Sequence, residues 1–133
     1  MSSNVPLATI TTAESLSSAY QAGQLSFSEL SLTATNLSRI NLKGADLSYA
    51  DFSGSDLSNA DLRGADLSYA RLCEADLTGA DLRGAMLIGT DLRETTVKEA
   101  RFQEADYDST ETRLPLGFDP KAARLIDIAS TPK

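Results

Sequence analysis

The chain has 133 residues and a formal net charge of −7, from 12 Lys and Arg against 19 Asp and Glu, so it fits a single acidic domain for which direct nucleic-acid or anionic-membrane binding is disfavoured. It contains no His, which excludes His-based triads, His general bases and His metal ligands. Its single cysteine, Cys73, cannot form an internal disulfide, and we expect an unreactive thiol in a reducing compartment.

The first residues lack the positive charge that is typical of an export signal. Neither Lys nor Arg precedes Arg39, so the charged region of a secretory signal is missing. No apolar run approaches the roughly 18 residues that a membrane span requires. We therefore expect a cytoplasmic protein without membrane contact. Separately, we expect residues 1–11 to form a flexible N-terminus.

A short helix is predicted over residues 12–24. Thr11 followed three residues later by Glu14 has the spacing of a capping box, apolar residues from Leu16 onward have helical spacing, and Gly23 is placed to end the helix. We expect this helix to cap the N-terminal end of the segment that follows.

A five-residue repeat runs through residues 25–109. A large apolar residue occupies every fifth position, a small residue, most often Ala, lies two positions before it, and Asp or Asn usually lies between them. The large residues are Phe27, Leu32, Leu37, Leu42, Leu47, Phe52, Leu57, Leu62, Leu67, Leu72, Leu77, Leu82, Leu87, Leu92, Val97, Phe102 and Tyr107.

A period of five fits neither regular secondary structure. On an α-helix each step of five residues turns the side chain by about 140° net, so the large residues would spiral around every side. On a flat strand an odd period would place successive large residues on opposite faces. The repeat therefore predicts neither a helix nor a flat sheet.

Each unit instead predicts a short extended segment followed by a corner. In residues 45–49, Ala45 and Leu47 would point inward, and Gly44 suits the bend before them. The sequence GADLSYA occurs at residues 44–50 and again at 64–70, which supports four units and twenty residues per coil. We predict an all-β solenoid of about four coils that keeps every large residue inside.

Residues 110–133 are predicted to form a turn and a second capping helix. The sequence LPLGFDPKAARLIDIAS offers a turn, then Asp119 as N-cap with Pro120 at the first helical position. This predicts a short helix near residues 120–129 that covers the other end of the solenoid.

The sequence NLKGADLSYADFSGSDLSNADLRGADLSYARLCEADLTGADLRGA resembles the pentapeptide-repeat proteins, whose consensus is A(D/N)LXX. The resemblance covers about two-thirds of the chain and implies a right-handed quadrilateral β-helix, here with short capping α-helices at both ends. Arg71, Met86, Thr96 and Arg101 depart from the consensus by replacing Asp. The family is especially numerous in cyanobacteria, and most of its members have no known biochemical role.

Stacking at twenty residues would align side chains into columns. Lys43, Arg63 and Arg83 would form a basic column beside Asn41, Asp61 and Asp81. We interpret these columns as a solvated, salt-bridged face, with a basic docking site as the alternative. Stacked aspartates follow from the consensus and nothing suggests a pocket around them, so no catalytic, cofactor-binding or metal-binding residues are predicted.

A candidate partner-binding patch is predicted on the face that carries Leu47. Tyr49 should lie beneath Tyr69, with Met86 and Ile88 on the same face, and clustered outward apolar residues favour a binding role. The alternatives are that a terminal helix covers these residues or that the tyrosines simply stack on each other.

The predicted function is a non-catalytic interaction or scaffold module with an unknown protein partner, for which a monomer is favoured over a dimer. The alternative, implied by the resemblance, is a DNA-mimicking inhibitor or protector of DNA gyrase, because fluoroquinolone-resistance relatives are acidic rods that bind gyrase in place of DNA. Residues 25–109 contain 8 basic and 15 acidic residues, so 8 − 15 = −7 accounts for the whole net charge. The column of Arg63 and Arg83 interrupts that acidity.

Overall fold

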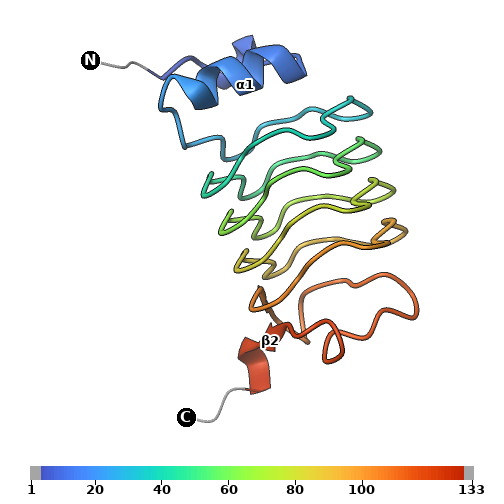
Figure 1. Cartoon of the computed structure of the whole chain (residues 1–133). Coiled ribbons are helices and arrows are strands. Elements are labelled where there is room, and N and C mark those ends of the chain that lie inside the picture. Colours follow the sequence, from blue (N-terminus) through green and yellow to red (C-terminus); the bar gives the residue numbers. More distant parts are fainter. Residues whose placement is uncertain (1–3, 131–133) are drawn as a thin grey trace.

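The computed structural model describes residues 4–130, which form a stack of coils with a helix at the N-terminal end (Figure 1). In chain order the elements are the 3-10 helix η1 (Leu7–Thr9), the helix α1 (Ala13–Gln21), the strands β1 (Asp106–Tyr107) and β2 (Ile126–Asp127), and the 3-10 helix η2 (Ile128–Ser130). The chain between α1 and β1 consists of short extended segments joined by tight turns.

Parallel β-bridges join residues that lie twenty apart in the sequence. One column of bridges runs through Ser26, Asp46, Asp66, Met86 and Asp106, and three further columns begin at residues 31, 36 and 41. Four columns per twenty residues give each coil four sides, so the register predicted from the repeated GADLSYA sequence is correct. Successive coils lie nearly parallel along the stack (Figure 1).

The large repeat residues fill the interior of the stack. All of them from Phe27 to Leu92 are buried, as is Phe102, whereas Val97 and Tyr107 are half-buried. The small residues of the repeat are buried with them, for example Ala45. Because the segments are extended for only three residues, the small and large positions both point inward and the residue between them points outward.

Each corner is a four-residue turn with one residue in the left-handed region. Ala45 N donates to the Leu42 carbonyl at 3.0 Å, and Gly44, the third residue of that turn, has φ of 72°. A positive φ at this position is the requirement of a type II turn. Tyr49 and Tyr69 occupy the same turn position, each with φ of 60°, so glycine is favoured there but is not obligatory.

Helix α1 begins one residue later than the sequence predicts. Its N-cap is Thr12: Ser15 N donates to Thr12 Oγ1 and Thr12 N donates to Ser15 Oγ, both at 3.0 Å. The predicted pairing of Thr11 with Glu14 is therefore wrong. A serine hydroxyl at the third helical position closes the capping box in place of the expected carboxylate.

The end of α1 follows the prediction. Gly23 adopts φ of 103°, its N–H donates to the Tyr20 carbonyl at 2.9 Å, and Gln24 N donates to the Ala19 carbonyl at 3.1 Å. These two bonds form a Schellman motif, which a glycine with positive φ completes without steric strain. Leu16 and Ala19 are buried against the first coil.

The N-terminal segment before α1 is attached to the folded body, contrary to the expected flexible terminus at residues 1–11. Ile10 is only 2% exposed and belongs to the core. Val5 N donates to Gln24 Oε1 at 2.8 Å. No periodic pattern predicts this packing, because it depends on single contacts. Residues 1–3 lie outside the described residues.

The predicted C-terminal helix near residues 120–129 is wrong. Asp119 Oδ1 accepts from Lys121 N at 3.0 Å and from Ala122 N at 3.2 Å, but only one turn follows. Arg124 then adopts φ of 66°, which is incompatible with continuing a right-handed helix.

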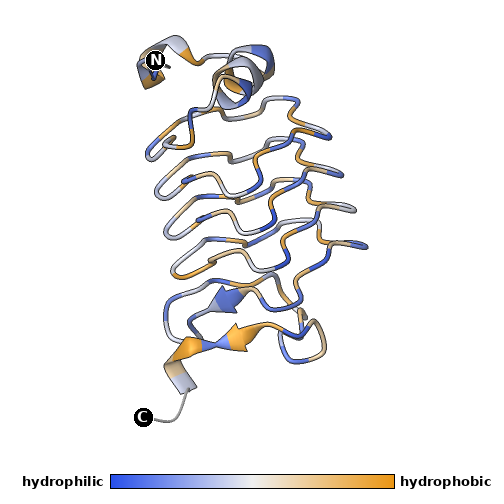
Figure 2. Ribbon diagram, turned by 60° about the vertical axis from the view of Figure 1, so that its left-hand side comes forward, coloured by the Kyte–Doolittle hydropathy of each residue, from blue (hydrophilic) through white to orange (hydrophobic). Residues whose placement is uncertain are grey.

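After that turn the tail adds to the solenoid. Strand β2 pairs in parallel with β1, Ile126 opposite Asp106 and Tyr107 opposite Asp127, again with a spacing of twenty. Figure 2 shows β1 and β2 side by side at the end opposite α1. The expectation of a monomer depended partly on a helical cap at this end, and it stays a prediction without that support.

Candidate functional site

Tyr49 and Tyr69 form a stacked pair on the outside of adjacent coils. Their ring centroids are 5.3 Å apart and the ring planes differ by 14°. Stacking does not bury them, since Tyr49 is 59% and Tyr69 41% exposed. The positive φ of both residues places them at the tip of a corner, where side chains project away from the core. The alternative that the tyrosines stack on each other is therefore true, and the pair is exposed as well.

Tyr69 is held on its other side by the loop that follows β1. Its hydroxyl donates to Glu111 Oε2 at 3.0 Å, and this hydrogen bond to a carboxylate raises the pKa of Tyr69 above its usual value. Its ring lies over Gly89, where an added Cβ would collide with the ring. Together with Thr112 these residues line a hollow of about 520 Å³.

The loop that contains Glu111 was not predicted. Asp91 is bridged to Arg113 across 22 residues, so the loop adds two residues to the regular coil of twenty. Thr112 N donates to the Asp108 carbonyl at 2.7 Å, which closes the loop into a turn. The only signal in the sequence is that the five-residue period stops after Tyr107.

Met86 and Ile88 lie on the same side of the solenoid as the tyrosines. The Ile88 carbonyl accepts from Tyr69 N at 2.8 Å, which makes the two residues neighbours across adjacent coils. Met86 is 39% exposed and Ile88 is half-buried. Helix α1 lies at the far N-terminal end of the stack and does not cover the coil that carries Met86 (Figure 1). We call Tyr49, Tyr69, Met86 and Ile88 the tyrosine patch.

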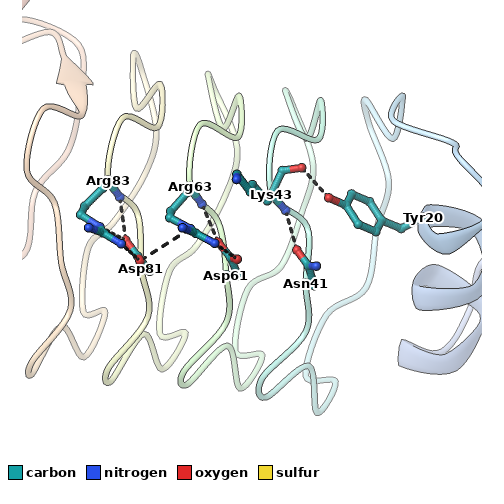
Figure 3. Close-up of polar contacts among 7 residues, drawn as sticks. All are labelled: Tyr20, Asn41, Lys43, Asp61, Arg63, Asp81 and Arg83. Carbon is teal, nitrogen blue, oxygen red and sulfur yellow. Dashed lines mark hydrogen bonds and ion pairs between the residues drawn. The ribbon is translucent and has the colours of Figure 1, made fainter.

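The basic and acidic columns pair as the sequence predicts (Figure 3). Arg63 binds Asp61 through two bonds, Nε to Oδ1 at 2.9 Å and Nη2 to Oδ2 at 2.8 Å, and Arg83 binds Asp81 in the same way at 2.8 and 2.7 Å. Arg63 Nε also lies 3.8 Å from Asp81 Oδ2, which connects adjacent coils. The arginine hydrogen bonds lower the pKa values of Asp61 and Asp81.

Lys43, the first member of the basic column, makes its contacts through its backbone. Its N–H donates to Asn41 Oδ1 at 3.1 Å, and its carbonyl accepts from the Tyr20 hydroxyl at 2.6 Å (Figure 3). The second bond fastens α1 to the solenoid. Asn41 is uncharged, so the ion-pair pattern begins only with Asp61.

The outward aspartates have a structural role at the corners. Asp46 Oδ1 accepts from Ser48 N at 3.0 Å and from Ser48 Oγ at 2.7 Å, and equivalent bonds recur at Asp51 and Asp56. Such bonds stabilise the bend by satisfying the N–H two residues ahead. No group of three or more His, Cys, Asp or Glu side chains in residues 4–130 is arranged to hold a metal ion. Cys73 is half-buried, and burial raises the pKa of its thiol, which disfavours the reactive thiolate.

The fold is a four-sided parallel solenoid, and many of its outward polar side chains form hydrogen bonds at the corners or ion pairs. These features define the class of repeat proteins. The family model described as pentapeptide repeats, in 8 copies, matches residues 26–64 and 65–103, more than half of the chain. The chain belongs to the pentapeptide-repeat family, whose members fold as right-handed β-helices and are generally not enzymes.

The chain is similar to several solved structures, of which the first described here supports the family. The pentapeptide repeat protein alr5209 from Nostoc PCC 7120 is 40% identical, with a TM-score of 0.67, over 87% of this chain and 95% of that one. A pentapeptide repeat protein of the Arabidopsis thaliana thylakoid lumen is 34% identical over 74% of this chain and 72% of that one, with a TM-score of 0.33. QnrB1, a plasmid-mediated fluoroquinolone resistance protein, is 24% identical over 62% and 58%, with a TM-score of 0.38.

None of the curated proteins matches the chain. The described residues contain no helix of the length and apolar character that crossing a membrane would require.

Proposed function

We propose that this protein is a non-catalytic interaction or scaffold module of the cytoplasm, which presents the tyrosine patch to a protein partner. The observation that carries the proposal is the exposure of Tyr49 and Tyr69 although each is held in place. Tyrosine is enriched in interfaces, where its ring buries a large area and its hydroxyl tolerates water.

The patch is organised before any partner arrives. Tyr69 is fixed by the stack on Tyr49, by the bond to Glu111 and by the turn geometry of its own backbone. Ordering a free side chain on binding costs about 0.5 to 1.5 kcal/mol, so side chains that are already ordered lose less of the binding energy. Met86 extends the patch with an adaptable apolar side chain.

A differential capture experiment tests the proposal. Tagged wild-type protein is compared with Tyr49→Ser plus Met86→Ser in native extract, and captured proteins are quantified by mass spectrometry. The matched control is Leu25→Ser plus Leu116→Ser, which removes two other exposed apolar side chains. A partner lost with the first variant and retained with the control supports the patch, whereas equal recovery with all three proteins refutes it.

The second candidate function is that of a DNA-mimicking inhibitor or protector of DNA gyrase. It is supported by the concentration of the entire −7 net charge in residues 25–109. The bidentate pairs of Arg63 and Arg83 weigh against it, because they neutralise the carboxylates on one side of the rod. A gyrase supercoiling assay decides between the two functions. Inhibition is ruled out if micromolar protein leaves supercoiling undiminished without a fluoroquinolone. Protection is ruled out if the same protein restores none of the supercoiling that a fluoroquinolone suppresses.

A further inference from the structure

Four arginines surround a hollow near the C-terminal end of the solenoid. Arg63, Arg83, Arg101 and Arg124 line a depression of about 560 Å³ that is open to solvent. Gly84, Gln103 and Glu104 complete its lining. We call this depression the arginine hollow.

The hollow arises where the column pattern changes. Arg101 is bridged to Asp81 and occupies the position that Asp61 and Asp81 hold in earlier coils. Gln103 occupies the position of Arg83, one coil on. In this coil the guanidinium of Arg101 stands where the two preceding coils have a carboxylate. The uncharged Gln103 stands where those coils have the arginine that pairs with the carboxylate.

The fourth arginine is supplied by the tail. The Arg124 carbonyl accepts from Glu104 N at 3.0 Å, which places Arg124 on the coil next to Arg101. The predicted helix over residues 120–129 would have placed Arg124 on a cap instead of on a coil. This cluster could therefore not be predicted from the sequence.

Two of the four guanidinium groups form no hydrogen bond or close ion pair in the part of the chain that the structure describes, although the charge of Arg101 helps to lower the pKa of Asp81. Arg63 and Arg83 bind Asp61 and Asp81, whereas the side chains of Arg101 and Arg124 make no hydrogen bond or ion pair within residues 4–130. With Asp61, Asp81 and Glu104 counted against the four arginines, the local charge is 4 − 3 = +1 in a chain of −7. Gln103 Oε1 is buried there without a hydrogen-bond partner among the same residues.

We propose that the arginine hollow binds a carboxylate-rich segment of a partner protein. Guanidinium groups bind carboxylates through paired, charge-assisted hydrogen bonds. Arg101 and Arg124 come from adjacent coils about 4.8 Å apart, so one short acidic segment can reach both. The inference rests on the proposed interaction role and names the chemistry of the partner.

Other anionic ligands suit the hollow less well. Small molecules bind in clefts that enclose most of their surface, whereas this hollow is open and its described lining contains no aromatic ring. A nucleic-acid backbone is charged along its whole length and would be repelled where it extends beyond the hollow over a chain of net charge −7, whereas an acidic segment of a few residues can lie within the hollow. An acidic protein segment can be held in place by contacts outside the hollow. Met86 lies on the side of the solenoid between the corners at Gly84 and Gly89. Gly84 lines the hollow and Gly89 lies under the ring of Tyr69, so a partner that lies across this side would reach both the hollow and the tyrosine patch.

The test measures fluorescence anisotropy of fluorescein-labelled hexaglutamate, with labelled hexaglutamine as the uncharged peptide. We expect saturable binding of hexaglutamate and its weakening by about tenfold or more in Arg101→Gln plus Arg124→Gln, because charge-assisted bonds are lost. The control Arg71→Gln plus Lys98→Gln makes the same change in net charge at exposed positions elsewhere, and it should alter binding by less than about twofold.

A second variant tests the hollow by adding a negative charge to one of the residues that line it. Gly84→Glu places a carboxylate inside, an added Cβ at residue 84 meets no atom within 4 Å, and Glu104 occupies the equivalent corner with φ of 64°. We expect this variant to lose hexaglutamate binding. Gly44→Glu makes the same change at the same corner two coils away, also in open space, and should keep it.

Three results overturn the proposal: no binding of hexaglutamate to wild-type protein, equal weakening in the Arg71 and Lys98 control, or displacement of the peptide by inorganic phosphate as effectively as by unlabelled hexaglutamate at equal ionic strength. If hexaglutamate does not bind but the tyrosine-patch variant loses a partner, only the hollow is refuted. If hexaglutamate binds and the tyrosine-patch variant keeps every partner, only the tyrosine patch is refuted.

Discussion

The ring of Tyr69 occupies the space into which a side chain at Gly89 would project, although the two residues lie at the same turn position of successive coils. The column of tyrosines ends at Gly89, where a further tyrosine would collide with the ring of Tyr69, and the hydroxyl of Tyr69 is bonded there to Glu111 in the loop.

Replacing Gly89 by Ala should displace this ring. Gly84 and Gly89 both have φ of 70°, but a Cβ at Gly84 meets no atom within 4 Å. Both Ala variants should lose about 1 to 2 kcal/mol of unfolding free energy from the left-handed backbone. Gly89→Ala should lose about 1 kcal/mol more, because the stack on Tyr49 is disturbed. Urea denaturation measures the difference, which should disappear when both substitutions are compared in a Tyr69→Ser background.

The bond between Tyr69 and Glu111 should be visible in an alkaline titration. The folded pKa of Tyr69 lies above its usual value, mainly because its hydroxyl donates to the Glu111 carboxylate. A raised folded pKa means that the stabilisation is complete below the unfolded value and is lost as pH rises through the folded one. Burial raises the pKa of Tyr107 as well, so ultraviolet titration of phenolate formation should show two late tyrosines, one of which is Tyr69. Glu111→Gln should move the titration of Tyr69 to lower pH, and an unchanged curve would contradict the hydrogen bond.

The ion pair of Arg93 with Asp91 should contribute to acid sensitivity. Arg93 binds Asp91 at 2.9 and 2.7 Å and holds the pKa of that carboxyl well below its usual range. A lowered folded pKa gives stability that is present above the unfolded value and is lost as pH falls toward the folded one. Arg93→Gln should therefore reduce the drop in melting temperature between neutral pH and about pH 3. Lys98→Gln removes an exposed cation that is not among the groups that lower the pKa of Asp91, and it should leave that drop unchanged.

The central coils should be the most sensitive to cavities. Leu67 is fully buried in the middle of the stack, whereas Val97 is half-buried near its end. Leu67→Ala should cost about 2 to 5 kcal/mol, and Val97→Ala should cost less because solvent and neighbouring side chains can fill the space. Denaturant titration of both variants measures this order, and equal costs would argue against one continuous core.

The repeat region could be predicted closely because its signal is periodic. A large apolar residue every fifth position and the recurrence of GADLSYA after twenty residues determined which side chains are inside and which residues are bridged, such as Asp46 and Asp66. The same register predicted the stack of Tyr49 and Tyr69. The same local preference recurs in many units, so one irregular unit has little effect on the predicted fold.

The segments outside the repeat could not be predicted as well, because each is decided by single contacts. Asp119 and Pro120 favour a helix, but Arg124 adopts a left-handed conformation and the following residues gain backbone hydrogen bonds from β1. Pairing with an exposed strand edge outweighs a weak helical preference. The arginine hollow depends on that outcome, and no periodic pattern in the sequence indicates it.

Helix α1 closes one end of the stack, whereas no further strand of residues 4–130 lies beyond β2 at the other end. We therefore expect that the solenoid can be extended more easily beyond β2, where only η2 follows among the described elements, than at the α1 end. Twenty-residue units from the regular coils, grafted after Asp127, would find backbone donors and acceptors already in register. Units inserted before Phe27 would have to displace Leu16 from the core. Because of this asymmetry, the protein is a suitable template for the design of longer β-helices of chosen length and surface charge.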